Sequence, residues 1–207
     1  MQLHRADVLA AAVELLDSDG LDALSMRRLA TKLGVQSGAV FWHFATKQAL
    51  LDAIAEHLLQ GVAEIDTTRS GLDQLAELAS RLRTALLTHR DGARVVSGTF
   101  VREPNTLHYG DAAVRAAIAA GVAAERAVLV VFTIQHYVLG QTIEEQALAE
   151  LTASAMAQTT IDTGHYPAIS SAIDHYNATP ADARFNYGLR LILDGVASAV
   201  DDLVSRP

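Results

Sequence analysis

Apolar residues recur at helical spacing along almost the whole of this chain of 207 residues. They return every three or four positions, which is the spacing that places side chains on one face of an α-helix. The run AVLVVFTI, residues 127–134, is rich in β-branched residues and would suit a strand by propensity alone. The alanine-rich residues before it and QTIEEQALAEL after it extend the pattern beyond the length of a strand. We therefore predict an all-α chain.

We expect about nine to ten helices, with three short helices and a longer one in the first 60 residues. Gly20 and Gly34 are typical helix stops, because glycine adopts the left-handed conformation without steric cost. Ser25 and Thr46 are typical N-caps. Loops are expected over 61–71 and over most of 152–180. The expected helices span residues 4–20, 25–33, 36–43, 46–60, 72–89, 91–98, 106–120, 124–149 and 182–204, with one short helix near 169–176.

The composition excludes several kinds of protein. The chain has no cysteine, so it has no disulfide framework, no thiolate zinc site and no cysteine nucleophile. Its N-terminus reaches acidic residues too early for a signal peptide. Its longest apolar run near the middle, AVLVVF, is far shorter than a membrane span requires. We expect a soluble, cytoplasmic protein.

A basic segment interrupts an otherwise acidic chain. The protein has 24 Asp and Glu against 16 Lys and Arg, a formal net charge of −8. From Leu24 to Leu50 there is no carboxylate, so that Arg27, Arg28, Lys32 and Lys47 have no local counter-charge. Removal of carboxylates is what an interface with a polyanion such as DNA requires.

The same segment has the spacing of a helix-turn-helix. A helix over 25–33, a turn at Gly34 and a helix over 36–43 would brace the second helix against a major groove. Arg27, Arg28 and Lys47 flank that helix, where phosphate contacts fix register without reading sequence. Spacing alone leaves a plain three-helix packing unit with solvated charges as an alternative. The residues expected to face the groove are Ser37, Gly38, Ala39, Phe41 and His43.

An aromatic cluster favours the DNA-binding reading. The stretch LSMRRLATKLGVQSGAVFWHFATKQALLDAIAEHLL resembles the DNA-binding domain of the tetracycline repressor (TetR) family of bacterial transcriptional regulators. The resemblance rests on Phe41, Trp42, His43, Phe44 and Lys47, followed by a leucine-rich helix. It implies a helix-turn-helix DNA-binding domain over 1–45, a connecting helix over 46–60, and a ligand-binding and dimerisation domain over 61–207.

The recognition residues depart from the family pattern in part. Phe41 stands where the family often has a tyrosine whose hydroxyl reaches a phosphate, so that contact is missing. Ser37–Ala39 differ from the tetracycline repressors at positions that read bases there, so we expect a different operator sequence. Trp42 is counted with the DNA contacts, although Trp42 and Phe44 suit a core position equally well.

The larger part of the chain resembles the tetracycline repressor subgroup, which binds its drug as a magnesium chelate. THRDGARVVSGTF at 88–100 and QHYVLGQTIEEQ at 135–146 carry this resemblance. His136 and Glu144 match residues of the metal site, but Val96 replaces its other histidine. One imidazole is a poor anchor for a hard cation, and a helix would hold His136 and Glu144 roughly 12 Å apart. We expect no metal and no cofactor.

The resemblance therefore implies a pocket that is retained but relined for a larger, less polar molecule. The alternative is that these residues fill a core, with His136 as a hydrogen-bonded interior histidine. The expected walls are Leu78, Leu82, Val96, Phe100, Ala113, Phe132, His136 and Glu144.

The resemblance also implies a function. It predicts a homodimer built from the last two long helices, which binds a palindromic double-stranded operator and is released by a small-molecule effector. We do not expect an enzyme, because the histidines are scattered and no motif for phosphate binding or nucleophilic catalysis is present. A helical dimeric ligand-binding protein with a non-functional DNA-binding domain remains the alternative, since Gly38 and Ala39 offer bases no hydrogen-bonding side chain.

Overall fold

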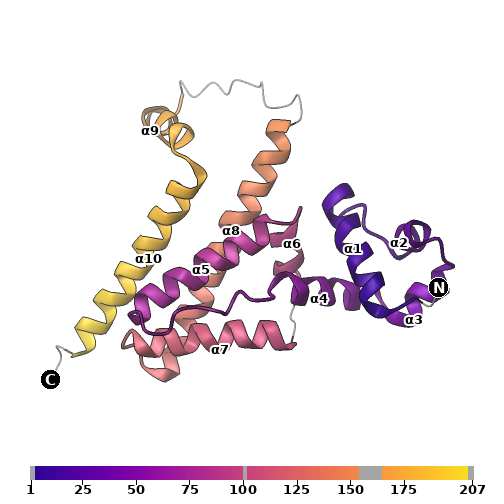
Figure 1. The fold of residues 1–207 in the computed structure, drawn as a ribbon. Helices are drawn as coiled ribbons and strands as arrows, with labels where there is room; N and C mark the ends of the chain where they lie inside the picture. The colour runs from indigo at the N-terminus through magenta and orange to yellow at the C-terminus, as the bar shows by residue number, and fades with distance from the viewer. Residues whose placement is uncertain (1–2, 100–101, 154–164, 205–207) are drawn as a thin grey trace. The chain divides into compact units, whose positions relative to one another are not determined.

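The computed structural model describes residues 3–99, 102–153 and 165–204. These described residues form ten α-helices and no strand, so the all-α prediction is confirmed (Figure 1). Residues 127–134 lie inside a long helix, because the helical pattern on both sides outweighs their strand propensity. The helices are α1 (Arg5–Asp19), α2 (Met26–Leu33), α3 (Ser37–His43), α4 (Lys47–Leu58), α5 (Gly71–Leu87), α6 (Gly92–Ser97), α7 (Pro104–Ala119), α8 (Ala124–Ala153), α9 (Pro167–Ala178) and α10 (Ala181–Val204).

Two boundaries differ from the prediction for a common reason. Helices α7 and α9 begin at Pro104 and Pro167, each in the first turn. Proline suits that position, because it has no N–H to leave unpaired and its φ is already helical. Helix α9 is therefore longer than the short helix expected near 169–176, and less of 152–180 is loop.

The chain divides into two compact units, residues 1–143 and 144–207, and α8 continues from the first into the second. The first unit contains α1 to α7 and the N-terminal part of α8. The predicted domain boundaries after residues 45 and 60 both fall inside this first unit, and that division into functional domains stays a prediction. The predicted DNA-binding segment, residues 1–45, and most of the expected pocket residues therefore belong to one unit.

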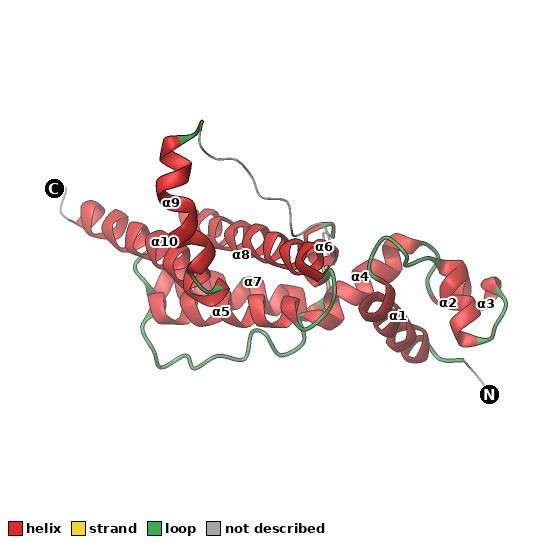
Figure 2. Cartoon of the chain, turned by 90° about the horizontal axis from the view of Figure 1, so that it is seen from above, coloured by secondary structure: helices red, strands yellow, loops and turns green. Residues whose placement is uncertain are grey.

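Helix α4 connects the first three helices to the rest of the first unit. It packs against α1 on one side and against α6 and α7 on the other (Figure 2). Its Leu50 and Ile54 are fully buried. Thr46 caps its start, as predicted, by accepting a hydrogen bond from the Ala49 N–H at 3.0 Å.

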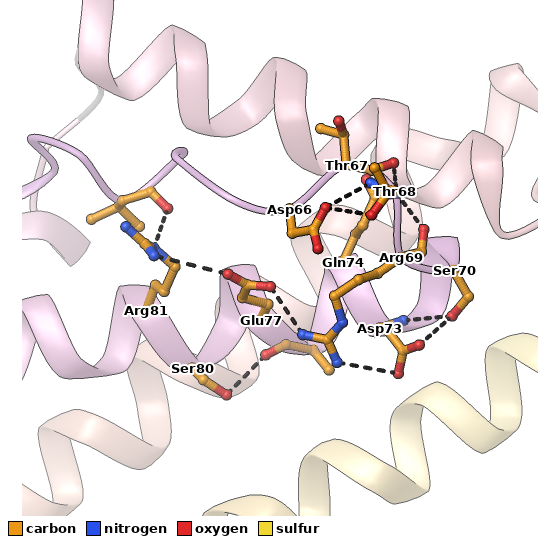
Figure 3. A network of polar contacts seen from close by, with 12 residues as sticks. Asp66, Thr67, Thr68, Arg69, Ser70, Asp73, Gln74, Glu77, Ser80 and Arg81 are labelled. Carbon is orange, nitrogen blue, oxygen red and sulfur yellow. Dashed lines mark hydrogen bonds and ion pairs between the residues drawn. The ribbon is translucent and has the colours of Figure 1, made fainter.

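A polar network fixes the connection between α4 and α5 (Figure 3). The Arg81 guanidinium on α5 donates to the carbonyls of Gly61 and Val62, just beyond the end of α4, at 2.9 and 3.2 Å. The buried Gln74 amide donates to the carbonyls of Thr67 and Arg69, at 3.2 and 2.8 Å. These irregular backbone groups are thus paired, which holds the connecting segment 61–69 against α5.

In the second unit, α10 combines buried and exposed apolar residues. Phe185 and Leu189 are buried, whereas Tyr187 and Leu191 are exposed. The Arg184 guanidinium lies 4.7 Å from the centre of the Tyr176 ring and donates to the Thr179 carbonyl at 2.8 Å, which ties α9 to α10. Across the described parts of the chain no single helix is long and apolar enough to cross a membrane; only α7 and α8 taken together, bent by 119°, meet that requirement.

Candidate nucleic-acid interface and ligand cavity

The turn between α2 and α3 has the geometry expected from its sequence. Ser25 caps α2 by accepting from the Arg28 N–H at 3.2 Å. Gly34 ends the helix with φ 67°, in the left-handed region that glycine occupies without strain. The Val35 N–H then bonds back to the Ala30 carbonyl at 3.0 Å, which closes a Schellman turn. This tight turn sets α3 against α2 as in a helix-turn-helix.

Helix α3 leaves most of its surface free. Val40 is its one buried residue. Gly38, Phe41 and Trp42 are exposed, and Ser37, Ala39 and His43 are partly exposed. The predicted groove-facing residues are therefore available on one short helix, and a side chain exposed as fully as Trp42, at 85%, does not belong to the core.

Phe44, two residues after Trp42, is buried, with only 1% of its surface exposed. The Arg5 guanidinium at the start of α1 lies 4.5 Å from the centre of its ring. Of the two aromatic residues that could each be core or DNA contact, Phe44 therefore belongs to the three-helix core and Trp42 does not. The N-terminal Arg5 was not among the predicted interface residues, because its partner is 39 positions away in sequence.

Two of the four cations in the basic segment are paired. Arg28 forms an ion pair with Asp19, and Lys32 with Glu14 at 3.0 Å. The expectation that all four lack a counter-charge was therefore wrong, because α1 packs beside α2 and supplies the carboxylates. Arg27 and Lys47 are exposed and form no ion pair with any described residue, which leaves them free for phosphates.

Residues at the start of α6 form hydrogen bonds and ion pairs with the turn between α1 and α2. Asp91 is buried with φ 57°, uncommon for a residue with a side chain, and its carboxylate accepts from the Leu21 N–H at 2.8 Å. Arg94, one turn further on, binds both Asp91 and Asp22 at 2.9 Å. The hydrogen bond from Arg94 lowers the pKa of the Asp22 carboxyl, and Lys47 adds a smaller electrostatic effect.

The residues just before α6 contact the end of α1. The His89 ring lies 3.0 Å from the Asp17 carboxylate, and the Arg90 N–H donates to the same group at 3.1 Å. The Arg90 guanidinium also donates to the Ser18 carbonyl at 3.1 Å. Residues 89–94 thus form a continuous polar contact with the DNA-binding segment.

The next two residues of α6 after Val95, Val96 and Ser97, line a cavity of about 490 Å³. Its size is within the range of sites for small molecules. Helices α4 to α8 of the first unit all contribute to its walls, together with Thr99 and Arg102. The residues that line it are Ala55, Leu59, Leu82, Val96, Ser97, Thr99, Arg102, Thr106, Tyr109, Gly110, Phe132, Gln135, His136 and Leu139.

The structure brings together four of the eight predicted pocket residues. Leu82, Val96, Phe132 and His136 line the cavity, and the ring centres of Phe132 and His136 are 5.9 Å apart. His136 is exposed, which argues against an interior histidine. The other four differ: Leu78 and Ala113 are buried but do not line the cavity, Glu144 is exposed and belongs to the second unit, and Phe100 lies outside the described residues.

Sequence reasoning missed most of the polar lining. Arg102, Thr106, Tyr109 and Gln135 all face the cavity. Thr106 and Tyr109 are three positions apart on α7, the spacing that places them on one face of a helix, and Gln135 precedes His136. The sequence shows this spacing, but it does not show which face of α7 points into the cavity. That depends on how α7 packs against α4 and α5. Within the described ranges no group of three or more His, Asp or Glu side chains is placed to hold a metal ion.

A helix-turn-helix with an exposed recognition helix is connected here, through α6, to a cavity. This combination defines a ligand-responsive DNA-binding regulator. Comparison with known families agrees with this class. Residues 8–54 match the bacterial regulatory proteins of the tetR family, and residues 68–200 match the tetracyclin repressor-like C-terminal domain.

Known proteins resemble the chain over nearly its whole length. It is 38% identical to the tetracycline repressor protein class A from transposon 1721 of Escherichia coli, over 95% of this chain and 91% of the relative. Among solved structures, BioQ with its natural double-stranded DNA operator has a TM-score of 0.73 at 36% identity, over 95% and 99%. A variant of TetR from Acinetobacter baumannii AYE in complex with minocycline has a TM-score of 0.75 at 35% identity, over 96% and 99%. The chain belongs to the TetR family of transcriptional regulators.

Proposed function

We propose that the protein is a repressor that binds a palindromic operator as a homodimer and is released when a small, largely apolar molecule enters the cavity. One observation carries this proposal. Helix α6 lines the cavity with Val96 and Ser97, and the same helix binds the DNA-binding segment through Arg94. A ligand that moves α6 therefore changes the cavity and the contact with the DNA-binding segment together.

The mechanism follows from linkage between two sites. A ligand that fits the cavity better in one arrangement of α6 favours that arrangement. If the recognition helices of the dimer are then wrongly spaced for successive major grooves, operator affinity falls by the same factor by which DNA weakens ligand binding. Helix α4 offers a second route, since Ala55 and Leu59 line the cavity and Lys47 begins the same helix.

The DNA contacts in this proposal are those left exposed and unpaired. Arg27 and Lys47 would bind phosphates, and Trp42 with the partly exposed side chains of α3 would lie at the groove. Arg28 contributes less, because its guanidinium is engaged by Asp19. The related protein BioQ has been solved with its double-stranded DNA operator, which supports DNA binding by this chain.

The dimer in this proposal uses α8 and α10, the last two long helices, as the family resemblance implies. Tyr187 and Leu191 are exposed on α10, and Leu148 is exposed on α8. Such apolar surface favours association. The function requires access to the chromosome and hence a cytoplasmic protein, and it assigns the chain no catalytic activity.

Salt dependence of DNA binding tests the proposal, with two arginines of the same helix as a matched pair. Fluorescence anisotropy on genomic fragments should give a log–log slope against salt of about −0.9 per phosphate contacted. Arg27→Gln should reduce the slope by about 0.9 per protomer, whereas Arg28→Gln should change it by less than half as much. A folded protein that binds no DNA at any salt concentration would instead support the ligand-binding protein with a non-functional DNA-binding domain.

A further inference from the structure

We propose that the cavity selects amphipathic anions: molecules with an apolar body and one oxyanion group, such as a carboxylate, which Arg102 and Tyr109 bind. This inference rests on the proposed function, because it takes the cavity as the effector site. It adds the chemical class of the effector, which the apolar walls alone do not give.

The charge of the lining is the first observation. On a chain with net charge −8, none of the lining residues described above is acidic, while Arg102 contributes a full positive charge. Arg102 makes no ion pair with any described residue. A guanidinium in a cavity without a carboxylate is available to pair with a ligand, and its planar fork matches an oxyanion.

An acidic group that contacts the lining, Glu56, does not cancel this charge. Glu56 on α4 lies behind Thr106 rather than in the lining. Its carboxylate accepts from the Asn105 N–H at 2.7 Å, the Thr106 N–H at 3.2 Å and the Thr106 hydroxyl at 3.1 Å. The Glu56 carboxylate is thus hydrogen-bonded to the N-terminal end of α7, where the helix dipole stabilises a negative charge.

Tyr109 supplies the second donor. Only 5% of its surface is exposed, yet its hydroxyl has no hydrogen-bond partner among the described residues. Burial raises the pKa of the hydroxyl well above its ordinary value, so it stays protonated and can donate. An acceptor on a ligand in the cavity could therefore take a hydrogen bond from this hydroxyl. Thr106, one turn earlier, cannot serve, because its hydroxyl already donates to Glu56.

The rest of the lining suits an apolar body. Leu59, Leu82, Val96 and Leu139 offer aliphatic surface, and Phe132 offers an aromatic face. A volume of about 490 Å³ has room for a molecule with two or three fused or linked rings. One end of such a molecule would meet Arg102 and Tyr109, and the remainder would lie against these side chains.

Two fluorescent probes with the same aromatic body separate charge from size. 1-Anilinonaphthalene-8-sulfonate carries an oxyanion, and N-phenyl-1-naphthylamine is the same ring system without it. We expect the native protein to bind the sulfonate more tightly than the neutral probe. Arg102→Gln should lower the affinity for the sulfonate about tenfold, as expected for one charge-assisted hydrogen bond, and leave the affinity for the neutral probe unchanged. Tyr109→Phe should also weaken only the sulfonate, by a smaller factor.

Control variants locate the effect. Arg115→Gln on the same helix α7, where Arg115 pairs with Asp111 outside the cavity, should change neither probe. Gly110→Phe fills the cavity: a Cβ at Gly110 meets no atom within 4 Å, so the helix keeps its place while the ring occupies the cavity. This variant should bind neither probe.

The outcomes decide between charge recognition and general hydrophobic binding. The inference would be overturned if Arg102→Gln lowered the affinity for both probes equally or for neither. It would also be overturned if the native protein did not bind the sulfonate. Binding of both probes to Gly110→Phe would place them outside the cavity and would overturn it too. These readouts involve no DNA, so they can succeed or fail independently of the salt-dependence test of the proposed function.

Discussion

At the scale of single residues, neighbouring side chains of the recognition segment have opposite roles. Trp42 is exposed and Phe44 is enclosed by the three-helix core. Because α3 has only seven residues and buries only Val40, the position of the short helix depends on the few side chains that anchor it. An aromatic anchor at the end of α3, Phe44, therefore fixes the helix, and the exposed side chains before it are not needed for that anchoring.

This difference predicts unequal costs of truncation. Trp42→Ala should change the free energy of unfolding by less than about 0.5 kcal/mol, as for an exposed residue. Phe44→Ala should lower it by about 3–5 kcal/mol, since it leaves a large cavity in a packed core. Urea unfolding followed by circular dichroism, at one protein concentration, measures both. Equal losses in the two variants would contradict the assigned roles.

At the scale of elements, α6 is the physical link between cavity and DNA-binding segment, and the ion pair of Arg94 with Asp22 is its most exposed part. Arg94 lowers the pKa of the Asp22 carboxyl below its ordinary value. A lowered carboxyl pKa means that the contact contributes fully above the unfolded pKa and is lost as the pH falls through the folded one. The link should therefore weaken only under acid conditions.

The predicted observation is a change in one titration. By NMR of the side-chain carboxyl, Asp22 should titrate below the ordinary value for aspartate in the native protein. In Arg94→Gln the midpoint should rise toward that ordinary value, because the hydrogen bond and the charge are both removed. The same midpoint in both proteins would mean that Arg94 does not hold Asp22 in solution.

Local sequence signals predicted the helices better than the pairings between them. Ser25, Gly34 and Thr46 act as predicted because capping and left-handed turns depend on a few adjacent residues. The partners of Arg28 and Lys32 lie on α1, and Asp22, one partner of Arg94, is 72 positions away in sequence, so tertiary packing decides these pairs. Four of the eight predicted pocket residues line the cavity, and its polar donors were missed because the inward face of α7 is set by packing.

At the scale of the whole molecule, association through α10 should depend on its exposed apolar side chains. Leu191 is 57% exposed in the single chain, and Leu107 on α7 is 55% exposed. Leu191→Asp should convert a dimer of 22.1 kDa protomers to a monomer in sedimentation equilibrium, because a buried unpaired carboxylate is costly. Leu107→Asp is the matched control and should stay dimeric. Dissociation of both variants, or of neither, would exclude α10 as the specific interface.

The most direct measurement of operator recognition is selection of genomic DNA fragments by the purified protein at moderate salt, followed by sequencing. Lys47→Glu is the comparison, since Lys47 is exposed, forms no ion pair with a described residue and should contact a phosphate. We predict that the native protein enriches fragments sharing one palindromic site and that Lys47→Glu enriches none. Equal enrichment by both proteins, or none by the folded native dimer, would contradict recognition of DNA through α3 and the start of α4.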